Sequence, residues 1–375
     1  MRKFELIAPC HFGMEAVLKK EIIDLGYDVT EVVDGRVTFW GDEEALCRAN
    51  INLRTAERIL IKIGRFTAQT YEELFQGTKA LSWEEYIPQD GKFWVAKAAS
   101  VKSKLFSPSD IQSIMKKAMV ERLKEIYHVS WFSEDGESFP IRVFIMKDEV
   151  TIGLDSTGDS LHKRGYRKLT AKAPIAENLA AALIMLTPWR GDRILVDPFC
   201  GSGTLAIEAA MIAKNIAPGL NRPFAGEQWD FANGKRVFDS IRADARDSIL
   251  DVKPDILGSD IDERSIDLCK KHAKKAGVMV NWAVRPLKEL STDAANGLIV
   301  CNPPYGERML EKREAEKLYR EMREKFDALD NWQVSVITAY REFEKVYGKR
   351  ADKRRKLSNG GMTCTLYQFF RERYI

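Results

Sequence analysis

The chain of 375 residues is too long for one hydrophobic core, which predicts two or three domains. Hydrophobic residues make up 45% and charged residues 30%, as in ordinary globular proteins, and no run approaches the roughly 18 apolar residues that would span a bilayer. The net charge of +4 excludes a uniformly basic coat for nucleic acid, so the positions of the charges matter.

The first 65 residues alternate between strand and helix patterns. The expected strands are 4–8, 35–39 and 58–66, and the expected helices are 13–25 and 42–50. This β-α-β-type order predicts a small ferredoxin-like domain at 1–65.

Residues 66–160 predict a second α+β piece. Helices are expected at 71–81 and 108–127, and strands at 93–98, 141–146 and 149–155. Lys147 and Asp148 are suited to a two-residue hairpin turn between the last two strands. Because no chemical constellation lies in this piece, we expect it to bind rather than catalyse.

From residue 161 the pattern changes to alternating strands and helices. Strands are expected at 193–197, 256–260, 278–284, 298–301, 333–339 and 363–370, and helices at 204–214, 263–276 and 311–329. This alternation predicts a doubly wound α/β domain, which binds ligands beyond the carboxyl ends of its strands.

The six cysteines form no C-x-x-C pair, and the four histidines do not cluster with them. Zinc sites and disulfide frameworks need closer spacing or a secreted context, so we expect reduced, mostly buried thiols and no metal. Residues 1–9 lack the basic flank and long apolar segment of a signal peptide. We expect a cytoplasmic protein with no membrane association, and no obligate protein partner is evident.

The sequence DPFCGSGT, here called the glycine turn (197–204), lies where a strand hands over to a helix. Gly201 and Gly203 allow a tight turn and let a ligand approach the backbone. The glycine spacing also fits a dinucleotide fingerprint, but the acid of that fingerprint follows after about 20 residues, and Asp260 lies much further along.

Asp197 at the strand end favours a cationic ligand. Its carboxylate would repel a pyrophosphate, whereas it suits the ammonium and sulfonium of S-adenosylmethionine. Asp260 ends the next strand, where its oxygens can accept hydrogen bonds from two ribose hydroxyls. A strand-turn-helix without a ligand is the alternative.

The Asn-Pro-Pro-Tyr loop (Asn302, Pro303, Pro304 and Tyr305) follows an apolar strand. The Asn302 side-chain oxygen and the Pro303 carbonyl can accept the hydrogens of a base amine and aim its lone pair at a methyl group. The prolines fix φ, and Tyr305 offers a ring on which a base can stack. Such a site needs no metal, nucleophile or general base. An ordinary turn after a strand is the alternative.

These two motifs resemble those of class I methyltransferases that act on exocyclic amines. HKRGYR (162–167), APIAENLAAALI (173–184), IAPGLNRPF (216–224) and LSNGG (357–361) further resemble the THUMP-domain RNA methyltransferases. The resemblance is to the bacterial branch that makes N2-methylguanosine in large-subunit ribosomal RNA, and it is strongest after residue 160. It implies a Rossmann-like methyltransferase domain at 161–375, preceded by ferredoxin-like (1–65) and THUMP (66–160) modules.

The resemblance also implies the roles of site residues. The catalytic contacts would be Asn302, Pro303, Pro304 and Tyr305, and the contacts to S-adenosylmethionine would be Asp197, Pro198, Phe199, Gly201, Ser202, Gly203, Thr204, Asp260 and Ile261. In one departure, Pro286 stands where many relatives carry an acid that bonds the adenine amine. A backbone group or Glu289 would then make that contact.

Two basic runs, 162–172 and 349–356, flank the expected site. Phosphate attraction there predicts RNA contacts from Lys163, Arg164, Arg167, Lys353, Arg354 and Arg355. A solvated surface is the alternative for each run.

Two other functions are compatible with the sequence. Methylation of the 6-amino group of adenine in DNA or RNA uses the same loop, although the N-terminal modules offer no duplex-reading helix-turn-helix. A catalytically silent RNA-binding protein is the second alternative, against which the intact Asp197, Gly201, Gly203, Asp260 and Asn302 argue.

Overall fold

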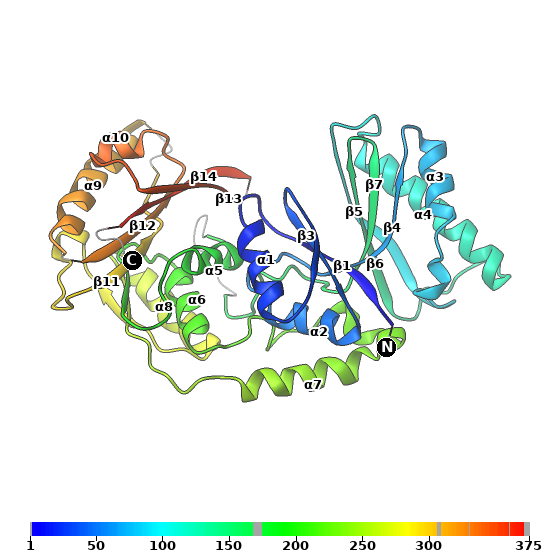
Figure 1. Ribbon diagram of the computed structural model, residues 1–375, viewed down its shortest axis with the longest axis horizontal. Helices are drawn as coiled ribbons and strands as arrows, with labels where there is room; N and C mark the ends of the chain where they lie inside the picture. Colours follow the sequence, from blue (N-terminus) through cyan, green and yellow to red (C-terminus); the bar gives the residue numbers. More distant parts are fainter. Residues whose placement is uncertain (1, 168–174, 306–308, 330, 360, 371–375) are drawn as a thin grey trace.

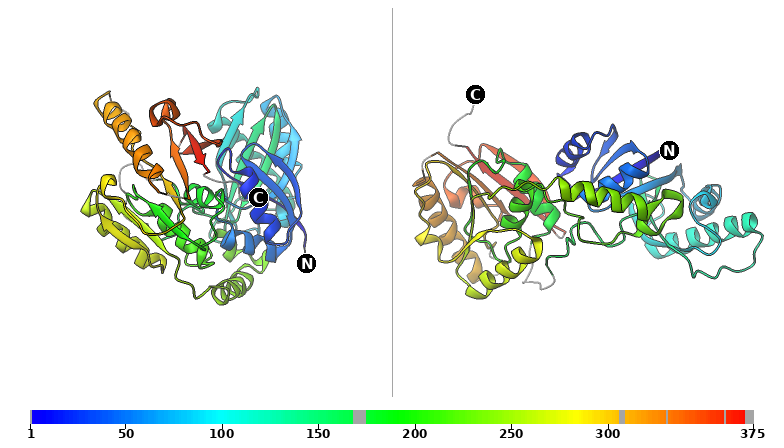
Figure 2. Two further views of the ribbon diagram at one scale, coloured as in Figure 1. Left: turned by 60° about the vertical axis from the view of Figure 1, so that its left-hand side comes forward. Right: turned by 90° about the horizontal axis from the view of Figure 1, so that it is seen from below.

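In the part of the chain that the structure describes, the strands form two seven-stranded sheets, one in each half (Figure 1). The computed structural model describes residues 2–167, 175–305, 309–329, 331–359 and 361–370. The right-hand view of Figure 2 shows the two halves side by side. No helix in these described ranges is both long and apolar enough to cross a bilayer.

The first sheet has the order β2-β3-β1-β4-β7-β6-β5. Its strands are β1 (Phe4–Pro9), β2 (Val29–Val33), β3 (Arg36–Gly41), β4 (Leu60–Thr67), β5 (Lys92–Val101), β6 (Ser138–Met146) and β7 (Glu149–Asp155). Its helices are α1 (Glu15–Asp24), α2 (Glu43–Asn52), α3 (Tyr71–Lys79) and α4 (Pro108–Tyr127). Because β4 pairs with both β1 and β7, the ferredoxin-like and THUMP parts share one continuous sheet.

Local sequence explains the boundaries of these elements. Helix α4 starts where sequence analysis places it, because the Ser107 side chain accepts a hydrogen bond from Asp110 N and Pro108 occupies the first turn. Lys147 and Asp148 have φ of 53° and 66°, and a two-residue type I′ hairpin turn requires positive φ at both of these positions. The predicted hairpin turn is therefore confirmed.

The second sheet has the order β10-β9-β8-β11-β12-β14-β13. Its strands are β8 (Ile194–Asp197), β9 (Ile256–Asp260), β10 (Asn281–Val284), β11 (Gly297–Cys301), β12 (Trp332–Thr338), β13 (Lys353–Asn359) and β14 (Met362–Phe369). Its helices are α5 (Glu177–Met185), α6 (Thr204–Ala213), α7 (Gly234–Asp247), α8 (Glu263–Ala276), α9 (Met309–Asp327) and α10 (Phe343–Tyr347). The first five strands in the order are parallel, and β14 runs antiparallel between β12 and β13. The predicted Rossmann-like α/β fold is confirmed.

Two strands and three α-helices of the described residues were not predicted from the sequence. They are β2, the edge strand β13 formed by the basic run around Lys353, and helices α5, α7 and α10. Helix α7 packs on α2 of the other half, beneath which it lies in Figure 1. The Trp229 ring, just before α7, stacks on Phe139 of β6 with ring centres 5.6 Å apart. These contacts join the two halves.

Candidate active site

The two predicted loops lie at one edge of the second sheet. Parallel strands β9, β8 and β11 are neighbours, with Asp197 beside Gly258 and Val196 beside Ile299. Asn302 immediately follows β11, so it leaves the same carboxyl edge as Asp197. Neighbouring strands are roughly 4.8 Å apart, which is close enough for the two loops to act on adjoining ligands.

Gly201 and Gly203 of the glycine turn have different surroundings. Gly203 has φ of 82°, and a Cβ there would lie 2.8 Å from the Trp282 ring, so this position is closed by packing. Gly201 has φ of 50°, and a Cβ there would meet nothing within 4 Å. The open side of the turn is therefore at Gly201, where a ligand can approach the backbone.

Asp197, which ends β8 at the start of the turn, carries a buried carboxyl group. It is 1% exposed, and one of its oxygens accepts a hydrogen bond of 3.1 Å from Phe199 N. Burial, with a smaller contribution from Asp260, raises the pKa of Asp197 to about 8. Such a group favours a cation as its neighbour.

Asp260 ties the glycine turn to β9. Its oxygens accept hydrogen bonds of 3.0 Å from Gly201 N and from Asp262 N. Ile261 beside it is 75% exposed and can cover a ligand, whereas Ser202 and Thr204 are buried with their hydroxyl oxygens 3.2 Å apart. Pro198, another predicted cofactor residue, is also buried.

The first and last residues of the Asn-Pro-Pro-Tyr loop are hydrogen-bonded to each other. The Tyr305 hydroxyl donates to the Asn302 side-chain oxygen, and the Tyr305 ring packs against the main hydrophobic core. Pro303 is buried and Pro304 exposed, and the Pro304 carbonyl accepts a hydrogen bond of 2.8 Å from Tyr319. An open Tyr305 ring was expected, but here its hydroxyl occupies the oxygen expected to hold the amine. A base amine would have to replace this hydroxyl.

Burial raises the pKa of the Tyr305 hydroxyl, and Cys364, whose sulfur lies 4.0 Å away, adds to the effect. The hydroxyl therefore stays protonated near neutral pH and cannot serve as a general base. Cys364 on β14 had no signal in the sequence, because it reaches Tyr305 only through the folding of the C-terminal hairpin.

Two predicted RNA contacts are wrong. Arg164 is 4% exposed, and its guanidinium donates to the carbonyls of Leu161 and Arg54. The Arg167 side chain is 10% exposed and pairs with Glu177. Both guanidinium groups are held inside the protein, whereas Lys163 is exposed and keeps its prediction.

The basic residues of β13 lie at the sheet edge. Lys353 and Arg354 are exposed, and Arg354 pairs with Glu344 at 2.9 Å. Arg355 donates to the carbonyl of Gly13 at 3.1 Å, so the C-terminal hairpin touches the loop before α1 (Figure 1). The RNA contacts of these residues stay predictions.

The predicted adenine contact would come from residues near the end of β10. Arg285 N donates to the Asp260 carbonyl at 3.0 Å, and Pro286 follows it. Glu289 is exposed, three residues beyond Pro286. Its contact with adenine likewise stays a prediction.

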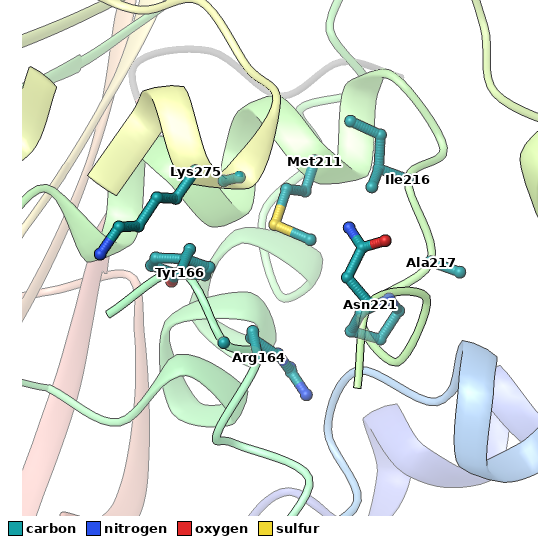
Figure 3. A pocket seen from close by; sticks show the side chains of 10 residues that line it. Arg164, Tyr166, Met211, Ile216, Ala217, Asn221 and Lys275 are labelled. Atoms are coloured by element: carbon teal, nitrogen blue, oxygen red, sulfur yellow. The ribbon is translucent and has the colours of Figure 1, made fainter. Parts of the chain in front are cut away.

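A small cavity of about 90 Å³ lies elsewhere in the second half (Figure 3). Its lining includes Tyr166, Met211 and Lys275, the last two from the C-terminal parts of α6 and α8. The glycine turn lies at the opposite end of α6, so this cavity is not the predicted cofactor site.

The family comparisons agree with this architecture. The family described as RMKL-like, methyltransferase domain matches residues 164–368, the RlmL ferredoxin-like domain matches 5–60, and the THUMP domain matches 68–155. The chain belongs to the RMKL-like methyltransferase family. The predicted methyltransferase identity and the module order are thereby confirmed.

Individual proteins extend this similarity along the chain. The chain is 46% identical to YpsC of Bacillus subtilis (strain 168), provisionally named an RNA methyltransferase, over 99% of this chain and 97% of that protein. It is 36% identical to the ribosomal RNA large subunit methyltransferase K/L of Syntrophotalea carbinolica (strain DSM 2380 / NBRC 103641 / GraBd1), over 98% of this chain but only 53% of that protein. The crystal structure of SMU.472 complexed with SAH is 44% identical, with a TM-score of 0.93 over the whole of both chains. That complex agrees with the expected cofactor, S-adenosylmethionine.

Proposed function

We propose that this protein transfers a methyl group from S-adenosylmethionine to the 2-amino group of guanine in RNA, with large-subunit ribosomal RNA as the substrate. The observation that carries this proposal is the shared sheet edge of Asp197, Asp260 and Asn302. The THUMP match and the RNA substrates in the names of the relatives support RNA over DNA.

The cofactor would lie against the glycine turn. Asp197 would face the cationic end of S-adenosylmethionine, Asp260 would accept hydrogen bonds from the ribose, and the open side of Gly201 would admit the ligand. In this placement the methyl group would be available to a base held at the loop that follows β11.

At that loop the base amine would replace the Tyr305 hydroxyl on Asn302. Asn302 and the Pro303 carbonyl would accept the two amine hydrogens, which concentrates the nitrogen lone pair on the side facing the methyl group. The nitrogen forms a bond to the methyl carbon as the carbon–sulfur bond breaks, and the amine proton then leaves to solvent. Positioning and electrostatics supply the rate, without a general base.

The product distinguishes this function from its alternatives. Purified protein, S-adenosylmethionine and large-subunit ribosomal RNA from a strain lacking the gene should yield N2-methylguanosine, detected by mass spectrometry of nucleosides. N6-methyladenosine would instead support the adenine alternative. Cofactor binding without any methylated RNA would favour a silent RNA-binding protein.

The basic strand β13 gives a separate prediction. Changing Lys353, Arg354 and Arg355 together to Ala should weaken RNA binding and lower the slope of log Kd against log salt by about 2. Filter binding or fluorescence anisotropy at several salt concentrations measures this slope. Three exposed lysines of α8, Lys270, Lys271 and Lys274, changed together to Ala, provide the charge-matched control. An unchanged slope in the β13 variant would show that this strand is only a solvated surface.

A further inference from the structure

Arg167 is held by three groups of this chain. Its guanidinium pairs with Glu177 at 3.0 Å and donates to the Ile175 carbonyl at 2.9 Å and to the Thr204 hydroxyl at 3.2 Å. The Arg167 side chain is 10% exposed and that of Glu177 is 3% exposed. The positively charged guanidinium of Arg167 therefore lies inside the protein. It contacts the glycine turn through Thr204.

Thr204 is the point at which the glycine turn becomes helix α6. It is the first residue of α6 and directly follows Gly203, whose φ is 82°. Its hydroxyl lies 3.2 Å from that of Ser202. The hydrogen bond from Arg167 to the Thr204 hydroxyl therefore holds the first residue of α6, where the chain leaves the turn.

Residues 164–167 also contact α6 one helical turn beyond Thr204, at Glu208. The Tyr166 hydroxyl donates to Glu208 at 3.0 Å, and Arg164 pairs with Glu208 at 3.5 Å. Because residues four apart lie on one face of a helix, Thr204 and Glu208 offer that face to residues 164–167. Arg164 also donates to the Arg54 carbonyl of the ferredoxin-like part. Segment 164–167 thus connects the N-terminal half to the start of α6.

We propose that Arg167 is a positioning residue that sets the orientation of the glycine turn and thereby the affinity for S-adenosylmethionine, rather than an RNA contact. This inference rests on the proposed cofactor site at that turn. A buried ion pair is a poor source of net stability, so its value here lies in fixing geometry. A misplacement of about 1 Å at a reacting site can cost about a hundredfold in rate.

The test separates positioning from stability. Arg167→Met should raise the Kd for S-adenosylmethionine about tenfold and lower the melting temperature, because Glu177 is left buried without its partner. The double variant Arg167→Met/Glu177→Gln should recover most of the melting temperature while its Kd stays about tenfold raised, since the bond to Thr204 is still missing. RNA affinity should stay within about twofold in both variants. Calorimetry, thermal unfolding and RNA binding by anisotropy measure these quantities.

A second, partly buried ion pair supplies the control. Arg242 of α7 pairs with Glu227, and its side chain is 11% exposed. Arg242→Met should lower the melting temperature but leave the Kd for S-adenosylmethionine within about twofold. The positioning role is overturned if Arg167→Met leaves this Kd unchanged, if the double variant restores it, or if RNA affinity alone falls. Failure of the wild-type protein to bind S-adenosylmethionine would instead refute the proposed cofactor site.

Discussion

Asn302→Ala should reduce turnover by about a hundredfold or more while the Kd for S-adenosylmethionine stays within a few-fold. Asn302 lies just beyond β11, whereas the predicted cofactor contacts come mainly from β8, β9 and the glycine turn. Removing its side-chain oxygen deletes an acceptor for the amine hydrogens, so the loss should fall on the chemical step. Single-turnover methylation of RNA and calorimetric titration of the cofactor measure the two effects separately.

Asn281→Ala is a suitable control for this variant. Asn281 is an exposed residue at the start of β10, at the opposite edge of the same sheet. Its replacement should change neither turnover nor cofactor affinity by more than about twofold. If Asn302→Ala lost cofactor affinity and turnover in equal measure, Asn302 would have to be reassigned to the cofactor pocket.

The strong local signals of the second half predict its structure well. Strand β9 and helix α8 have the expected bounds because Asp262 caps the helix at Arg264 N and Gly277 ends it in the left-handed region. The shared edge of Asp197 and Asn302 follows from parallel pairing, which the alternation of strands and helices already indicates.

The wrong predictions concern side chains whose partners lie outside the basic run 162–172. Arg164 and Arg167 belong to a basic run typical of an RNA contact. In the structure, Arg164 instead contacts Arg54 and Glu208. Arg167 contacts Glu177 and Thr204, so both side chains lie inside the protein. No local pattern distinguishes such arginines from exposed ones. Strand β13 was missed for a related reason, because its four consecutive basic residues do not alternate with apolar ones and its pairing with β14 is decisive.

Asp197→Asn is expected to have opposite effects on binding and stability. It should weaken S-adenosylmethionine binding by about a hundredfold, because the buried carboxylate is lost as the neighbour of the ligand's positive charge. It should also stabilise the free protein near neutral pH. The folded pKa of Asp197 is raised to about 8 from 3.8, so the folded state holds a proton that the unfolded state has released. Stability contributed by this group therefore falls as pH rises through that interval.

Two measurements check this linkage. The difference in melting temperature between Asp197→Asn and the wild type should grow from about pH 4 to pH 8 and then level off, because the wild type alone must ionise a buried carboxyl. Binding of the cation should lower the pKa of Asp197, so the wild type should release a proton on binding at pH 7. Calorimetry in buffers of different ionisation enthalpy detects this release, which Asp197→Asn should lose. A melting-temperature difference independent of pH, with proton release retained in the variant, would show that another group faces the cation.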